Sequence, residues 1–168
     1  VRQGKALYVG ISKYPKEATE FAYKYLAERD VHCLLYQGKY NLFNREPEEE
    51  GILRQAKENG TGFIAFSPLA QGLLTNRYLN GIPEDSRMAR GGFLKKEQLT
   101  EDVLSKIKAL NKMAEERGQT LAEMALAWVL KDDLVTSVII GASSVAQLED
   151  NLKAIRNTSF TKEELRRL

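Results

Sequence analysis

Polar side chains follow several short apolar runs of this chain, and their types could bind an organic ligand. Ser12 and Lys13 follow the first run, Gln37 follows the second, and Ser67 follows the third, whose last residue is Phe66. Hydroxyl and amide groups donate and accept hydrogen bonds, and the face of a phenylalanine ring stacks on flat groups. Together these residues suit a planar ring that carries an amide.

A second polar group follows the fourth apolar run, where residues 141–144 (GASS) lead directly into a predicted helix. Free backbone amides and the helix dipole attract anions at a helix start, so an anion such as phosphate is chemically reasonable there. A purely local interpretation stays open for both groups. Strand-end Ser and Gln residues often only cap loops, and Ser144 with Gln147 also matches a capping box.

The elements that must position these residues alternate between strands and helices. Strands are predicted at residues 6–11, 31–36, 62–66 and 136–140. Helices are predicted after Pro15, from Pro47 to Gly60, on both sides of Gly118, after Ser144 and after Thr161. Two helices carry apolar stripes that should be buried, one made of Ala18, Phe21, Ala22, Tyr25 and Leu26, the other of Leu148, Leu152 and Ile155.

Four strand-plus-helix units predict an α/β fold with parallel strands joined by right-handed crossovers. A doubly wound sheet and part of an eight-stranded α/β barrel both fit this pattern. A barrel needs about 200 residues or more, so 168 residues could supply about four of its eight units. The two open sheet edges predict an incomplete domain, completed by a missing N-terminal half or by a second chain.

Composition narrows the classes of partner and site. The chain is 43% hydrophobic and 29% charged, with a formal net charge of +2, which argues against nucleic acid and membrane surfaces as partners. With one cysteine and one histidine, no internal disulfide and no metal site are expected. Cys33 is expected to be buried, and Trp128 is expected to pack in the core. His32 is expected to be a core or lining residue of a strand. A single cysteine that forms no disulfide also fits a cytoplasmic location.

Four ordered motifs resemble the aldo-keto reductase family. They are residues 10–14 (GISKY), residues 36–37 (YQ) followed by 40–45 (YNLFNR), residues 66–74 (FSPLAQGLL), and residues 141–151 from Gly-Ala-Ser to Asn. The resemblance implies that residues 1–168 form the C-terminal half of a TIM (β/α)8 barrel, that is, strands five to eight with their helices. The N-terminal half of the barrel would be absent. The third motif, with residues 81–83 and 86–87, is most similar to the branch of L-glyceraldehyde-3-phosphate and methylglyoxal reductases and potassium-channel β-subunits.

The resemblance also implies an NADPH site. Ser12 and Gln37 would hydrogen-bond the nicotinamide carboxamide, and Phe66 would stack on the ring. The remaining implied contacts follow the cofactor outward: Ser67, Pro68, Leu69 and Gln71 along the pyrophosphate, Arg77, Ser86 and Arg87 closing over it, and Gly141, Ser143, Gln147, Asp150 and Asn151 around the adenosine. Gly141 and Gln147 stand where many members carry Lys and Arg, so NADH stays an alternative.

The family's catalytic tyrosine, lysine, aspartate and histidine come from the first four strands, so no catalytic residue is assigned here, and Tyr8, Tyr36 and Tyr40 are expected to pack as aromatic residues. The implied function is part of an NADPH-dependent reductase of small aldehydes or ketones, of the methylglyoxal or triose-phosphate type. The alternatives are a non-catalytic NADPH-binding regulatory subunit and an inactive half-barrel fragment. Homo-oligomerisation stays open.

Overall fold

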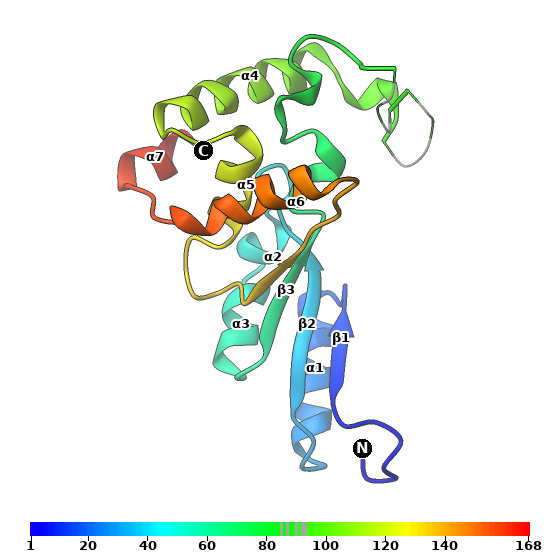
Figure 1. Ribbon diagram of the computed structural model, residues 1–168. Coiled ribbons are helices and arrows are strands. Elements are labelled where there is room, and N and C mark those ends of the chain that lie inside the picture. The colour runs from blue at the N-terminus through cyan, green and yellow to red at the C-terminus, as the bar shows by residue number, and fades with distance from the viewer. Residues whose placement is uncertain (85, 87, 90, 92–93) are drawn as a thin grey trace. The chain divides into compact units, whose positions relative to one another are not determined.

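The computed structural model describes residues 1–168 except 85, 87, 90 and 92–93 (Figure 1). The chain divides into two compact units. Unit 1 consists of Val1–Pro68 and Val129–Ile140, and unit 2 consists of Leu69–Trp128 and Gly141–Leu168. Each unit is described by itself.

Unit 1 is built on a parallel sheet of four strands in the order β1-β2-β3-β4. The strands are β1 (Val9–Ser12), β2 (Cys33–Lys39), β3 (Gly62–Phe66) and β4 (Ser137–Ile139). A doubly wound sheet reverses its strand order at one point, whereas the strands of a (β/α)8 barrel follow one another in sequence. The observed order confirms the predicted fold class, one half of a TIM barrel.

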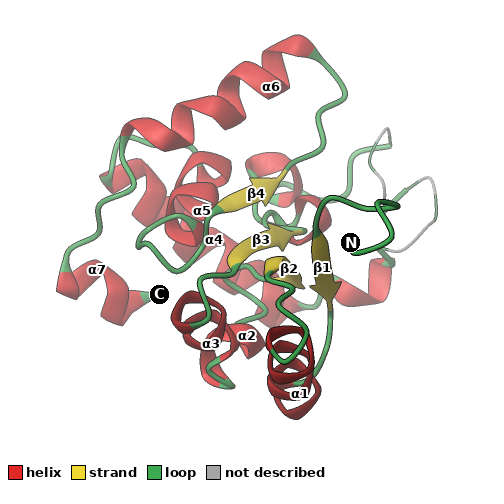
Figure 2. Ribbon diagram, turned by 90° about the horizontal axis from the view of Figure 1, so that it is seen from below, coloured by secondary structure: helices red, strands yellow, loops and turns green. Residues whose placement is uncertain are grey.

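Three helices of unit 1 lie along one face of this sheet: α1 (Lys16–Ala27), α2 (Glu46–Glu49) and α3 (Ile52–Glu58) (Figure 2). On that face Tyr36 and Phe63 stack with their ring centres 5.4 Å apart, and both are almost completely buried. The single helix predicted up to Gly60 is two helices, because Gly51 adopts a left-handed backbone (φ +78°) that interrupts it.

Several sequence expectations for unit 1 need correction. The first strand begins at Val9, and Leu7 and Tyr8 before it are 83% and 68% exposed. On α1 the buried residues are Thr19 and Tyr23, whereas Phe21 from the predicted stripe is 68% exposed. The apolar stripe of α1 is wider than the strip that its neighbours cover, so the pattern alone misplaced the buried face.

The expectation for His32 was also wrong, and those for Cys33 and Trp128 were confirmed. His32 is exposed, precedes β2, and has its Nε2 3.2 Å from the carbonyl oxygen of Gly60. Cys33 is 3% exposed and Trp128 is 1% exposed. The Trp128 ring is therefore part of the core, as its position on the apolar helix face predicted.

Unit 2 contains a long, mostly irregular segment after β3, followed by helices. Its elements are η1 (Ala70–Gly72), η2 (Asn76–Tyr78), η3 (Lys96–Gln98), α4 (Glu101–Glu116), α5 (Leu121–Val129, whose last residue belongs to unit 1), α6 (Val145–Leu152), η4 (Lys153–Arg156) and α7 (Lys162–Arg167). Ile107, Met113, Leu121 and Met124 pack with Tyr78 in its core. The helix starts predicted after Gly118 and after Thr161 are confirmed, and Thr120 and Thr161 form capping boxes there.

The predicted buried stripe of α6 is wrong. Leu148, Leu152 and Ile155 are 41%, 52% and 67% exposed, whereas Asn151 and Ala154 are buried. The helix therefore turns a mixed face toward its own unit and leaves its apolar stripe outside. No helix within the described part of the chain is long and apolar enough to cross a membrane.

Candidate functional site

In unit 1, three of the predicted site residues lie on neighbouring strands and on one face of the sheet. Ser12 is in register with Gln37, and Gln37 with Ile64, two positions before Phe66. Partners in register point to the same side, so these side chains share the face opposite Tyr36 and Phe63, which face the helices. Parallel strands thus bring a hydroxyl, an amide and an aromatic ring to one end of the sheet.

Two contacts describe the immediate surroundings of these groups. The Ser12 hydroxyl donates to the backbone carbonyl of Gln37 (3.1 Å), whose strand continues to Lys39. The Lys13 ammonium lies 5.9 Å from the centre of the Phe66 ring. A cation and an aromatic face therefore adjoin at this strand end, next to the amide of Gln37.

The segment after β3 has an unusual backbone. Ser67, Ala70 and Gln71 all have left-handed φ values, +53°, +47° and +60°, although none of them is glycine. Such residues are disfavoured by contacts of their Cβ atoms and persist where other interactions hold them, often where a ligand binds. Ser67 is additionally followed by Pro68, which restricts it further.

In unit 2, five predicted residues line one cavity of about 500 Å³: Leu69, Arg77, Gln147, Asp150 and Asn151. The other residues that line it are Thr75, Asn76, Pro83, Thr120 and Ala122. The wall thus combines the loop after β3, the start of α5 and one side of α6. Positions up to 82 apart in the sequence meet here, between Leu69 and Asn151.

The chemistry of this cavity suits a nucleotide. Arg77 supplies a guanidinium group, which recognises phosphate through a fork of donors. Asn151 is 5% exposed, and its Nδ2 is buried without a hydrogen-bond partner. A buried amide donor left unpaired is costly, so Asn151 favours an acceptor that the described residues do not supply.

The other predicted residues of unit 2 that the structure describes do not line this cavity. Ser86 is completely buried and its hydroxyl accepts a hydrogen bond from the backbone of Ala89 (3.2 Å). Ser143 donates through both its backbone and its hydroxyl to the side-chain oxygen of Gln147 (2.7 and 3.0 Å). Gly141 is exposed, Gln71 belongs to η1, and Arg87 lies outside the described residues.

Sequence reasoning missed Thr75, Asn76, Pro83, Thr120 and Ala122 in this cavity wall. Thr120 caps the start of α5, since its hydroxyl accepts from the backbone N–H of Glu123 (3.2 Å). For Thr75, Asn76 and Pro83 the available signal was their position in the irregular segment after β3, because such segments often carry functional residues. Ala122 lies inside α5 and had no such signal.

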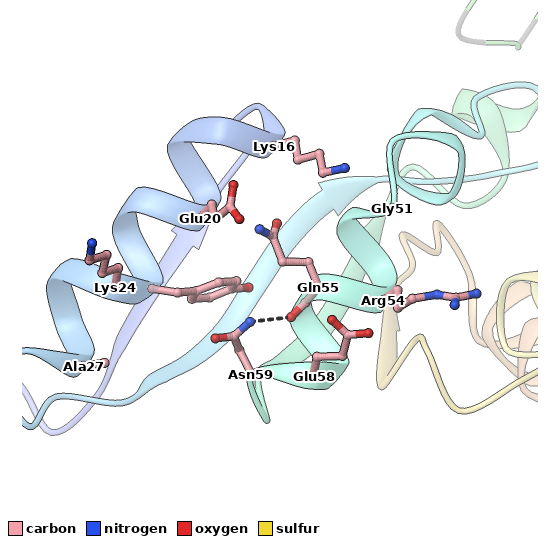
Figure 3. Close-up of a pocket in the computed structure, with 10 residues that line it drawn as sticks. Lys16, Glu20, Lys24, Ala27, Gly51, Arg54, Gln55, Glu58 and Asn59 are labelled. Atoms are coloured by element: carbon pink, nitrogen blue, oxygen red, sulfur yellow. Dashed lines mark hydrogen bonds between the residues drawn. The ribbon is translucent and has the colours of Figure 1, made fainter.

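A second cavity, of about 520 Å³, lies in unit 1 between α1 and α3 (Figure 3). Lys16, Lys24 and Arg54 line it together with Glu20 and Glu58, so residues of both charge signs contribute to its wall. Burial raises the pKa of Tyr23, also in this wall, to about 12, which keeps its hydroxyl neutral. The mixed charge indicates no single class of ligand.

The tyrosines that could suggest proton transfer are packed or plainly exposed. Tyr40 is completely buried, and its hydroxyl donates to Glu48 (2.9 Å) and accepts from Lys131 (2.9 Å). Burial, and then the nearby Glu48 carboxylate, raise the pKa of Tyr40. Tyr36 stacks on Phe63, whereas Tyr8 is 68% exposed, so the packing expected for Tyr8 is wrong.

Across the described positions, no three His, Cys, Asp or Glu side chains are grouped to hold a metal ion.

Comparison with known proteins bears on this arrangement. The model of the aldo/keto reductase family matches residues 1–168. L-glyceraldehyde 3-phosphate reductase from Escherichia coli is 52% identical over 169 residues, covering 98% of this chain and 49% of the relative. A probable voltage-gated potassium channel subunit beta from Arabidopsis thaliana is 36% identical over 159 residues, covering 92% of this chain and 48% of the relative.

A solved structure shows the same likeness. The crystal structure of a thermostable aldo-keto reductase in complex with the inhibitor epalrestat has a TM-score of 0.69 and 26% identity, covering 99% of this chain and 48% of that chain. The chain thus spans about half the length of the relatives that it matches. Because the family model extends over every residue, the chain belongs to the aldo/keto reductase family.

Proposed function

We propose that this chain supplies the NADPH-binding part of a reductase of small aldehydes and ketones. The cavity of unit 2 carries the proposal, because it combines the Arg77 guanidinium with an unsatisfied, buried Asn151 amide. Arg77 would pair with cofactor phosphate, and Asn151 would donate to an acceptor nitrogen of the adenine. These assignments follow the family resemblance, and the chemistry of both side chains fits them.

The nicotinamide end of the cofactor is assigned to unit 1. Ser12 and Gln37 would bind the carboxamide, and Phe66 would hold the ring by stacking, at a strand end where Lys13 adjoins. A bound NADPH supplies the hydride for carbonyl reduction. The chain's own residues bind and orient the cofactor, and the proton donor is assigned to the other half of the barrel.

The proposed substrates are small carbonyl compounds such as methylglyoxal or a triose phosphate. The support is the 52% identity with L-glyceraldehyde 3-phosphate reductase, which extends over almost all of this chain. A non-catalytic, NADPH-binding regulatory role is the second candidate, favoured by the 36% identity with a probable potassium channel subunit beta. Turnover of methylglyoxal by a full-length protein containing this chain would support the reductase, and binding without turnover would support the regulatory role.

The cofactor assignment is tested by titrating NADPH into the chain while following the fluorescence of the reduced nicotinamide. We expect saturable binding, no consumption of NADPH with methylglyoxal, and weaker binding of NADH. Arg77→Met should weaken NADPH binding about tenfold, in line with about 1.5–3 kcal/mol for a hydrogen bond to a charged group. Asn151→Leu, which keeps the branching and the number of heavy atoms of the side chain but removes the amide, should weaken it similarly.

The matched control is Lys112→Met, which removes the same charge from an exposed position of α4. It should leave the dissociation constant unchanged within about twofold. Equal effects of Arg77→Met and Lys112→Met would mean that only net charge matters, and the cavity assignment would be wrong. Oxidation of NADPH by the isolated chain with methylglyoxal would refute the assignment of the proton donor to other strands.

A further inference from the structure

The segment 40–45 (YNLFNR), which follows β2, has no part in the proposed cofactor contacts, yet it is held rigidly. Asn41 is 1% exposed and Tyr40 is not exposed at all. The backbones of Asn41 and Asn44 bond each other in both directions (3.1 and 3.0 Å). The Arg45 guanidinium donates two hydrogen bonds to the Glu48 carboxylate (3.1 and 3.2 Å), which also accepts one from the Tyr40 hydroxyl.

Asn41 connects this segment to the residue that follows β3. Its Nδ2 donates to the backbone carbonyl of Ser67 (2.9 Å), and its Oδ1 accepts from the backbone N–H of Phe43 (2.9 Å). Turning the amide around would oppose oxygen to the Ser67 carbonyl and nitrogen to the Phe43 N–H. Both contacts therefore assign the same orientation of the amide.

Ser67 requires such a partner because its backbone is unfavourable on two counts. It is not glycine but has φ +53°, and it precedes proline, which favours extended backbone in the residue before it. The carbonyl of its neighbour Phe66 also accepts from the backbone N–H of Tyr40 (3.4 Å). Two consecutive carbonyls at the end of β3 are thus held by two consecutive residues, Tyr40 and Asn41.

We propose that Asn41 is a positioning residue, which holds Ser67 in its left-handed conformation and thereby keeps the preceding Phe66 in place for the nicotinamide ring of the cofactor. This inference rests on the proposed function and deepens it. It assigns no contact between Asn41 and the cofactor, because its amide is already used by Ser67 and Phe43. The effect of removing the amide should be confined to ligands that carry the nicotinamide half.

The test compares two ligands, NADPH and adenosine 2′,5′-bisphosphate, which lacks the nicotinamide half. Asn41→Ser removes the donor to Ser67, and Asn41→Asp keeps the shape and the acceptor for Phe43 while opposing the Ser67 carbonyl with oxygen. Both variants should weaken NADPH binding about tenfold or more, the effect of leaving one buried partner unsatisfied. Both should bind the bisphosphate as tightly as the parent chain does, within about twofold.

Asn44→Ser is the matched control, since it makes the same change three residues along the same segment without touching the Ser67 contact. It should leave both affinities in place. A rescue adds a second readout. In a Ser67→Gly background, glycine adopts the left-handed conformation without the Asn41 bond. There, Asn41→Ser should weaken NADPH binding less than about threefold. This comparison remains informative even if Asn41→Ser alone folds poorly.

The outcomes separate the two proposals. Unchanged NADPH binding in the Asn41 variants would overturn the positioning role and leave the proposed function intact. An equal loss of affinity for both ligands would also overturn the positioning role, because Asn41 would then only support the fold. If the parent chain bound neither ligand, the proposed function itself would fail, and the positioning role with it.

Discussion

At the scale of single residues, buried amides mark the places where this chain is prepared for a ligand. Asn41 has every polar group of its side chain engaged, and it holds a strained residue. Asn151 is also buried, at 5% exposed, yet its Nδ2 has no partner inside the described part of the protein. A satisfied amide stabilises a conformation, whereas an unsatisfied one retains a donor for an incoming acceptor. The two asparagines therefore perform different tasks.

Gly38, near the C-terminal end of β2, allows a close approach in the core of unit 1. A Cβ atom on Gly38 would lie 2.6 Å from Cζ of Phe63 and 3.0 Å from Cε1 of Tyr36. Both rings are almost completely buried and stacked on each other, so neither can move aside. We expect Gly38→Ala to lower the free energy of unfolding by about 1–3 kcal/mol, measured by urea denaturation.

Gly62→Ala serves as the control for that substitution. Its Cβ would meet the hydroxyl of Thr136 at 3.2 Å, a contact that a small side-chain shift relieves. Gly62→Ala should lower the free energy of unfolding by about 1 kcal/mol or less. If both variants lost the same stability, a general intolerance of alanine in these strands, and not the stacked rings, would be the cause.

At the scale of elements, Arg117 joins the end of α4 to the C-terminal segment. Its guanidinium donates to Glu164 (2.5 Å), Gln119 (2.9 Å) and the backbone of Ser159 (2.9 Å), and it lies 3.8 Å from the centre of the Phe160 ring. Its side chain is only 5% exposed. The planar guanidinium of Arg117 therefore connects three chain segments of unit 2. A lysine ammonium could not make the same set of contacts.

The Glu164 partner makes this connection pH-dependent. The hydrogen bond from the backbone of Thr161 lowers the pKa of Glu164; partial burial opposes this effect, and Arg117 adds to the lowering. Because the folded-state pKa lies below the unfolded value of about 4.3, the stabilisation is present above that value and is lost as pH falls through the folded-state pKa. Glu164→Gln should thus destabilise the chain at neutral pH, with the difference shrinking in acid.

Urea denaturation at several pH values measures that difference. Glu163→Gln is the matched control, since Glu163 is 72% exposed and its contact with Arg166 is 3.5 Å long. Its effect on stability should be within about 0.5 kcal/mol at every pH. A difference between Glu164→Gln and the parent chain that grew toward acidic pH would contradict the assigned sign.

At the scale of the whole molecule, apolar surface remains exposed in each unit. In unit 1, Phe21 and Tyr25 form a tilted ring pair on the outer side of α1. In unit 2, Val145, Leu152 and Ile155 are 73%, 52% and 67% exposed. Contiguous exposed apolar residues favour association, so the isolated chain should self-associate as its concentration rises.

Phe21→Glu and Ile155→Glu test this expectation one unit at a time. Each should reduce the concentration-dependent increase in mass seen by sedimentation, and each should leave the free energy of unfolding within about 0.5 kcal/mol, because the side chains are exposed. Ser105→Glu adds the same charge at an exposed position of α4 and should not change association. Equal effects of all three would indicate charge repulsion and not loss of an apolar surface.

Sequence patterns were sufficient for the features that depend on near neighbours along the chain. The strand Gly62–Phe66, the helix start after Thr161 and the family motifs were all recognised from residues a few positions apart. The strand ends that carry Ser12 and Phe66 were located in the same way. Helix periods, caps and strand ends are local properties, which explains why they could be predicted.

What only the tertiary structure decided depends on residues that are distant in sequence. The buried side of α1 and of α6, the meeting of Thr75, Thr120 and Asn151 around one cavity, and the bond from Asn41 to Ser67 all belong to this class. A periodic pattern shows that a helix has an apolar side, but the neighbours that pack on it determine how much of that side is buried. An amide can likewise bond many carbonyls, and the fold selects the one 26 residues away.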